Sequence, residues 1–183
     1  IRGASMTIWV SSRFQAPRVA SGQKVERAVS LLAPWDEFPD LGLGDDEKHL
    51  KLAFEDIDAP IDGVIGPEKS HVEELIAFVS KWNRDTPLLI HCWAGVSRSS
   101  ASAFITACLH NPEADEVALA NIMREASPTA KPNARLIAFA DEILGRNGRM
   151  IDAVAAMSAH EFTEEAIPFS IPSQFDAVRG HWV

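Results

Sequence analysis

The stretch from Pro87 to Ser100 constrains the fold of this chain more than any other part of the sequence. Residues 88–90 form a short apolar run behind the proline, which predicts a buried strand. From Ser97 onward the residues are small and helix-compatible, and the apolar ones recur at helical spacing. The stretch therefore predicts a strand, a tight turn and a helix, in that order.

Cys92 and Arg98 lie in that turn and are separated by five residues. A five-residue loop at a helix N-terminus can aim several backbone N–H groups at one point, where the helix dipole adds positive potential. The dipole, the guanidinium and the polar neighbours His91 and Ser99 all favour the thiolate of Cys92 over the thiol. The turn is therefore predicted to be an anion site that contains a nucleophile.

Two further residue types fit an anion site. Arg98 offers a planar fork that can bind two oxygens of a tetrahedral oxyanion. Gly95 lets the loop adopt a positive φ and lets the backbone approach a ligand closely. The residues expected to contact the anion are Trp93, Ala94, Gly95, Val96, Ser97 and Arg98.

Residues 91–100, HCWAGVSRSS, resemble the His-Cys-x5-Arg-Ser/Thr signature of cysteine-dependent phosphatases, the protein tyrosine phosphatase superfamily, here expected to be of a bacterial type. The resemblance implies an α/β fold with a central, mostly parallel sheet of four to five strands flanked by helices. The loop of residues 92–98, called the signature loop below, would lie at the carboxyl end of its strand. Two other readings are a rhodanese-type loop and a plain turn with a buried cysteine.

The resemblance also implies a reaction, the hydrolysis of a phosphomonoester through a cysteinyl-phosphate intermediate. Cys92 would attack phosphorus while Arg98 and the loop amides hold the oxygens. Ser99 would help the thiolate to leave, and His91 would orient the loop without acting as an acid or base.

A general acid is expected on the loop before the signature strand. Residues 54–60 contain Phe-Glu-Asp followed by a proline, which resembles the Phe-Glu/Asp-Asp-x-x-Pro acid loop of dual-specificity and lipid phosphatases. Asp56 is the expected proton donor, with Asp58 and Asp62 as alternatives. Asn133 matches a Pro-Asn element that holds neighbouring loops by hydrogen bonds, although a helix cap explains it equally well.

The substrate class follows less directly from the residues. The signature loop carries no lysine, which disfavours polyphosphorylated inositides, and the chain has no tyrosine. Trp93 either lines a wall for an aryl group or packs beneath the loop. We expect a protein tyrosine or dual-specificity phosphatase; the alternatives are a non-catalytic phosphate- or phosphopeptide-binding module and a phosphatase of non-protein phosphoesters.

Length and composition set the remaining expectations. The 183 residues suit one domain over residues 6–157 with a C-terminal tail, 158–183, packed on it, and residues 1–5 are expected to be a cloning remnant. The net charge of −9 argues against nucleic acid and membrane as partners. Two cysteines and no signal segment favour a reducing, cytoplasmic location. No metal or cofactor is expected, because the histidines show no paired ligand spacing.

Overall fold

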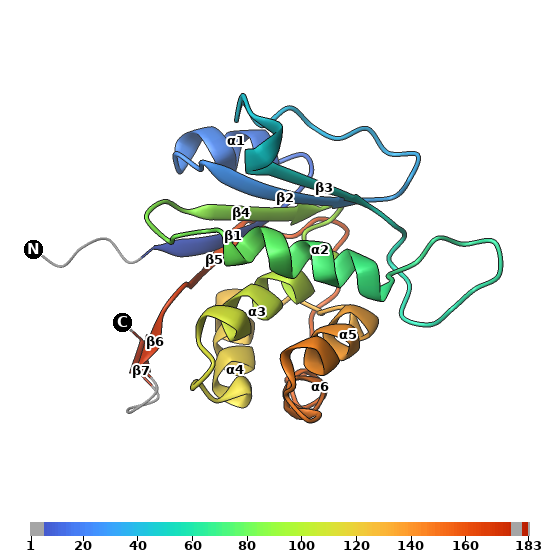
Figure 1. Cartoon of the computed structure of the whole chain (residues 1–183), viewed down its shortest axis with the longest axis vertical. Helices are drawn as coiled ribbons and strands as arrows, with labels where there is room; N and C mark the ends of the chain where they lie inside the picture. Colours follow the sequence, from blue (N-terminus) through green and yellow to red (C-terminus); the bar gives the residue numbers. More distant parts are fainter. Residues whose placement is uncertain (1–5, 177–180, 183) are drawn as a thin grey trace, which may run out of the picture.

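The computed structural model describes residues 6–176 and 181–182, and in this part of the chain one sheet organises the fold (Figure 1). The sheet has five strands in the order β3-β2-β4-β1-β5. Four strands are parallel, and β5 runs antiparallel to β1 at one edge. The strand bounds are Thr7–Ser12 for β1, Arg27–Leu32 for β2, His49–Ala53 for β3, Leu88–Cys92 for β4 and Phe169–Pro172 for β5, with β6, Phe175–Asp176, and β7, His181–Trp182, in a separate pair.

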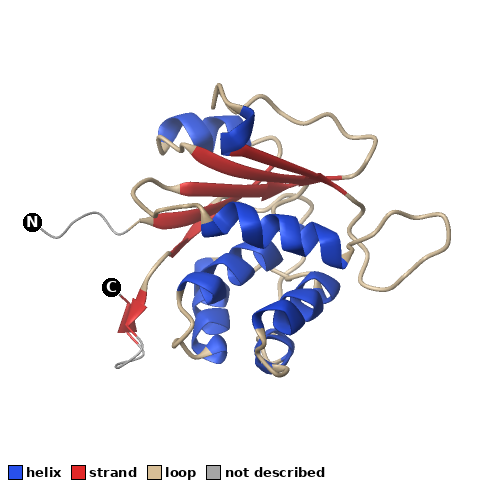
Figure 2. Ribbon diagram, in the orientation of Figure 1, coloured by secondary structure: helices blue, strands red, loops and turns tan. Residues whose placement is uncertain are grey.

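Helices cover both faces of this sheet (Figures 1 and 2). The first, α1, lies on one face, and the others lie on the opposite face, where they form a thicker layer. Their bounds are Ala16–Gly22 for α1, Lys69–Ser80 for α2, Arg98–His110 for α3, Glu116–Ala126 for α4, Ala134–Leu144 for α5 and Arg149–Ala155 for α6, with a 3-10 turn, η1, at Asp46–Lys48. The predicted fold class is therefore confirmed.

Side chains of β4 alternate between the two faces of the sheet. Leu88 and Ile90 enter the large core against α2 and α3, whereas Leu89 enters the smaller cluster under α1. Successive side chains of a strand point to opposite faces. His91 and Cys92 therefore lie on opposite faces of the sheet, His91 on the α1 face and Cys92 on the α3 face.

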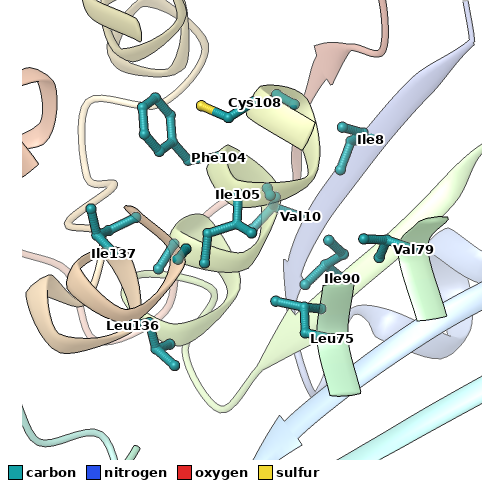
Figure 3. Packing of buried hydrophobic residues seen from close by; sticks show 14 of the residues in the cluster. Ile8, Val10, Leu75, Val79, Ile90, Phe104, Ile105, Cys108, Leu136 and Ile137 are labelled. Carbon is teal, nitrogen blue, oxygen red and sulfur yellow. The ribbon is translucent and has the colours of Figure 1, made fainter. Parts of the chain in front are cut away.

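The helix that follows the signature loop, α3, lies at the centre of the large core (Figure 3). Every residue from Arg98 to Cys108 is buried. Small side chains allow this close packing, and the buried hydroxyls of Ser102 and Thr106 donate to carbonyls one turn earlier, Arg98 O and Ser102 O, both at 2.8 Å. A fully packed helix gives the loop before it a rigid support.

Runs of apolar and β-branched residues at 6–11, 28–33, 49–54 and 88–90 predict four strands, which agree with β1, β2, β3 and β4 to within two residues. The sequence did not predict β5, which places Phe169 and Ile171 of the expected tail in the large core. The prediction for residues 1–5 lies outside the described residues. In the part of the chain that the structure describes, every helix is too short or too polar to cross a membrane.

Candidate active site

The signature loop lies at the carboxyl end of β4, between β4 and the N-terminus of α3. Its conformation is fixed from outside, because within the described chain four of its carbonyls accept hydrogen bonds from backbone amides of other segments. These bonds are Arg13 N to Trp93 O at 3.1 Å, Ala166 N to Ala94 O at 2.9 Å, Lys131 N to Val96 O at 2.9 Å and Asn133 N to Ser97 O at 3.2 Å.

Those outward carbonyls determine where the amides point. In a planar trans peptide the C=O and the following N–H point in opposite directions. Anchoring the four carbonyls outward therefore turns the next N–H groups toward the interior of the loop, and Gly95 N indeed donates to Cys92 Sγ at 3.3 Å. The inward amides and the start of α3 together form an anion nest.

Gly95 is required by both conformation and space. Its φ is +75°, and a Cβ built on it would lie 2.7 Å from the carbonyl carbon of Ser11 and 2.8 Å from the nitrogen of Ser12. The loop thus packs directly on the backbone at the end of β1, where no other residue fits. The positive φ is the one that the sequence suggested for this glycine, whereas its packing on β1 was not predicted.

Cys92 and Arg98 face the same space. The thiol of Cys92 is buried and lies 3.1 Å from Ser99 Oγ. Arg98, also buried, donates from Nη1 to Phe54 O at 2.8 Å, while its Nε bonds to no described residue. A buried guanidinium N–H without a protein partner is costly unless an acceptor from outside reaches it.

A cavity of about 410 Å³ opens onto these two side chains. Trp35 and Trp93 contribute its aromatic surface, and Asp36, Glu55 and Asp56 contribute carboxylates. Trp93, 41% exposed, also packs edge-on against Phe14 with ring centroids 5.3 Å apart. Trp93 therefore lines a wall of the cavity and packs beside the loop.

His91 belongs to a hydrogen-bond relay on the α1 face. Its Nδ1 lies 3.1 Å from Cys92 O, and its Nε2 bonds to Ser30 Oγ, which in turn lies 2.7 Å from His49 Nε2. Burial lowers the pKa of His91 to about 4, so the ring is neutral at pH 7. A carbonyl can only accept, so the ring proton sits on Nδ1 and Nε2 accepts from Ser30.

The hydrogen bonds of the relay therefore all donate in one direction, from His49 through Ser30 and His91 to the backbone carbonyl of Cys92. Ser30 donates its only hydroxyl proton to His91, so it accepts from His49 Nε2–H. His49 in turn lines a separate cavity of about 520 Å³. Because His91 and Cys92 lie on opposite faces of the sheet, the imidazole acts on Cys92 only through the backbone carbonyl.

The loop between β3 and α2 brings Asp56 to the same cavity as Cys92. Oδ1 of Asp56 accepts from Ser97 Oγ and from Asn133 Nδ2, both at 2.8 Å, whereas no hydrogen bond from the described residues reaches Oδ2. Asn133 also donates to Ile57 O at 3.1 Å and caps α5 through Oδ1. Asn133 therefore combines the two roles that the sequence left open.

The alternative acids lie elsewhere. Asp58 lines a neighbouring cavity of about 390 Å³ together with Lys131, and Asp62 lines neither of these two cavities. For residues 35–47 the sequence predicts either an exposed loop or one wall of the cleft, and Asp36 lies in that wall. Sequence reasoning missed Glu55 as a wall residue and Ser30 and His49 as the relay. Only the alternation of β2, which places Ser30 on the face of His91, could have pointed to one of them.

The second cysteine takes no part in this geometry. Burial raises the pKa of Cys108 to about 12, and the thiol lies in the large core as the sequence predicted. Among the described residues, no group of three or more His, Cys, Asp or Glu side chains is placed to hold a metal ion.

The protein-tyrosine phosphatase family model matches residues 60–130, the segment that contains the signature loop and α3. This segment of the chain is similar to the protein-tyrosine phosphatase family, whereas Asp56 and Asn133 lie outside the matched residues. No curated protein matches this chain. The prediction of a bacterial type stays a prediction.

Solved structures share the fold of this chain. Human DUSP28 is 17% identical with a TM-score of 0.56 over 76% of this chain and 89% of its own. DUSP15 is 17% identical with a TM-score of 0.57 over 84% and 94%. PTPMT1 in complex with PI(5)P is 12% identical with a TM-score of 0.57 over 82% and 95%.

Proposed function

We propose that this protein is a phosphatase that hydrolyses phosphomonoesters of proteins, on tyrosine or with dual specificity, through a cysteinyl-phosphate intermediate. One observation carries the proposal: Cys92, Arg98 and residues of the signature loop line one cavity, and the Gly95 amide donates to Cys92 Sγ. This set offers a nucleophile and donors for three equatorial oxygens of a phosphoryl group.

In the first step the Cys92 thiolate attacks phosphorus, and the bond from phosphorus to the ester oxygen breaks. Arg98 and the loop amides hold the non-bridging oxygens as charge redistributes. Asp56 gives a proton to the departing oxygen, which leaves as an alcohol or phenol. Oδ2 is the suitable proton carrier, because Ser97 and Asn133 occupy Oδ1.

In the second step Asp56, now ionised, takes a proton from the water that attacks the cysteinyl phosphate. The bond from sulfur to phosphorus breaks, and inorganic phosphate forms. Ser99 donates to the sulfur as it regains its negative charge, which the 3.1 Å separation from Cys92 Sγ allows. The enzyme then returns to its starting state.

The walls of the cavity support an aryl or protein ester over a polyphosphorylated inositide. Trp35 and Trp93 offer aromatic surface for a phenyl ring. Arg98 is the one basic side chain among the residues that line this cavity, and three carboxylates accompany it. Additional phosphates, such as those of an inositide, would meet repulsion there.

The proposal includes a reducing location such as the cytoplasm, because the reaction needs a free thiol on Cys92. Cys92 is 3% exposed and its thiol is free, so only small oxidants and phosphoryl groups that enter the cavity reach it.

Turnover of p-nitrophenyl phosphate, with and without orthovanadate, tests the proposal. We expect hydrolysis that vanadate inhibits, and we expect Cys92→Ser to lose turnover while still binding inorganic phosphate. Binding of phosphate by the wild type without hydrolysis would instead support the non-catalytic module. A panel of phosphotyrosine and phosphoserine peptides and inositide phosphates then separates the substrate classes, with the inositides expected to be poor substrates.

A further inference from the structure

Residues 163–168 reach the back of the signature loop because of the direction of β5. This strand runs antiparallel to β1, with Val10 opposite Phe169. The residues that precede Phe169 therefore continue past the carboxyl end of β1. The signature loop begins at the same edge of the sheet, since Ser12 of β1 lies opposite Cys92.

Two hydrogen bonds join this segment to the active-site edge. Ala166 N donates to Ala94 O at 2.9 Å, and Ser12 Oγ donates to Glu165 Oε1 at 2.7 Å. Ser12 and Ala166 are buried, whereas Glu165 is exposed. Thr163 stiffens the segment, because its hydroxyl donates to Glu165 O at 2.8 Å and accepts from Glu165 N at 3.3 Å.

The bond to Ala94 acts on the anion nest through one peptide plane. Holding the Ala94 carbonyl outward turns the Gly95 N–H inward, where it donates to Cys92 Sγ. Gly95 also packs on the backbone of Ser12, the residue that binds Glu165. Ser12, the loop and the C-terminal segment thus form a closed ring of contacts.

We propose that Ser12, Glu165 and Ala166 form a clasp that holds the signature loop in its anion-binding conformation. Glu165 is a positioning residue that acts through Ser12 and Ala166, and it does not touch the reacting atoms. The C-terminal segment is then a working part of the active site, where the sequence suggested only a packed tail. This inference rests on the proposed function of the same loop.

The hydrogen bond between Ser12 and Glu165 could serve only to fasten the C-terminal segment, or it could also position the signature loop. These two roles give different results when the bond is removed. If Glu165 only fastens the tail, its loss lowers the unfolding temperature and leaves the affinity of the loop for tetrahedral anions unchanged. If the clasp positions the loop, its loss weakens orthovanadate and phosphate binding and lowers kcat, because the inward amides are no longer preorganised. Anion affinity is therefore the readout that separates the two.

The experiment compares Glu165→Ala with Glu165→Gln and with Glu164→Ala, the neighbouring exposed carboxylate. Removing one hydrogen bond to a charged group predicts a loss of about five- to tenfold in kcat and in orthovanadate affinity for Glu165→Ala. Glu165→Gln is expected to stay within about twofold of the wild type, since its amide oxygen still accepts from Ser12. Glu164→Ala is expected to match the wild type.

A double-mutant cycle of Ser12 and Glu165 gives a second test of the clasp. Ser12→Ala should lose activity by a similar factor, and adding Ser12→Ala to Glu165→Ala should cause little further loss, because both changes break the same bond. Wild-type kcat and vanadate affinity in Glu165→Ala would overturn the clasp. A Glu165→Gln variant as impaired as Glu165→Ala would overturn it too.

The clasp can be tested even if the proposed phosphatase activity is absent. If the wild type hydrolyses no phosphoester, the clasp is tested by calorimetric binding of inorganic phosphate to the wild type and to Glu165→Ala. Weaker phosphate binding by Glu165→Ala supports the clasp, and equal binding overturns it.

Discussion

Gly95 is the residue at which the signature loop packs most closely on the sheet. An alanine there would place its Cβ 2.7 Å from the backbone of Ser11, so the loop would have to move away. A displacement of about 1 Å in a catalytic loop costs on the order of 10²-fold in rate. We predict that loss of kcat for Gly95→Ala, measured with p-nitrophenyl phosphate.

Gly145 supplies the matched control for this substitution. Its φ is +65°, similar to that of Gly95, but a Cβ on it would meet nothing within 4 Å. Gly145→Ala should therefore cost about 1–2 kcal/mol of unfolding free energy and leave kcat unchanged. Equal kcat in both variants would show that Gly95 is present only for its dihedral angle.

Ser30 tests the relay behind Cys92. Ser30→Ala removes the donor to His91 Nε2, so the ring is no longer held with its Nδ1 proton on the Cys92 carbonyl. We predict that alkylation of Cys92 by iodoacetate at neutral pH slows about fivefold, the value of one hydrogen bond. His110→Gln, at a histidine that bonds to Val79 O, should leave alkylation unchanged. Unaltered alkylation in Ser30→Ala would remove the relay from the mechanism.

At the scale of elements, the loop between β3 and α2 decides which carboxylate acts. Asp56 lines the Cys92 cavity, Asp58 lines the neighbouring one and Asp62 lines neither. Asp56→Asn is therefore expected to lower kcat by about 10²- to 10⁴-fold with esters of poor leaving groups. Asp58→Asn and Asp62→Asn should stay within about threefold of the wild type. An effect below threefold in Asp56→Asn would move the role to another acid, Glu55 included.

The elements also show what the sequence could and could not predict. The apolar run before Cys92 and the small residues after Arg98 predicted β4 and α3, because both signals are local. The strand β5 was missed, since Phe169–Pro172 is short, ends in proline and gains its partners only from β1. A pattern within such a segment carries little information about pairing.

In the candidate active site, too, local motifs were predictable from the sequence and long-range contacts were not. The signature fixed the positions of Cys92, Arg98 and the loop amides along the chain. The bonds from Ser30 to His91 and from Ser12 to Glu165 join residues 61 and 153 positions apart. Such contacts depend on strand register and on the path of the C-terminal segment, which no short motif encodes.

At the scale of the whole molecule, buried histidines make stability depend on pH. Burial lowers the pKa of His49 and of His91 from 6.5 to about 4, and it also lowers the pKa of His71 and of His110. Unfolded histidines take up protons below about pH 6.5. Folded His49 and His91, in contrast, stay neutral down to about pH 4. The free energy of unfolding should therefore decrease as the pH falls from 6.5 to 4.

Urea unfolding at several pH values between 7 and 4 measures this dependence. His49→Gln keeps a donor for Ser30 and cannot titrate, so its stability should decrease less steeply with falling pH than that of the wild type. An identical slope in His49→Gln would show that carboxylates, and not this histidine, control the acid sensitivity.

The proposed mechanism requires a covalent bond between phosphorus and Cys92. Rapid mixing with p-nitrophenyl phosphate, quenching in denaturant and mass spectrometry of the digested protein measure that bond directly. We predict one phosphoryl group on the peptide that contains Cys92, formed as fast as the first release of p-nitrophenol and absent in Cys92→Ser. Turnover without a phosphorylated Cys92 peptide, or turnover that persists in Cys92→Ser, would contradict the cysteinyl-phosphate mechanism.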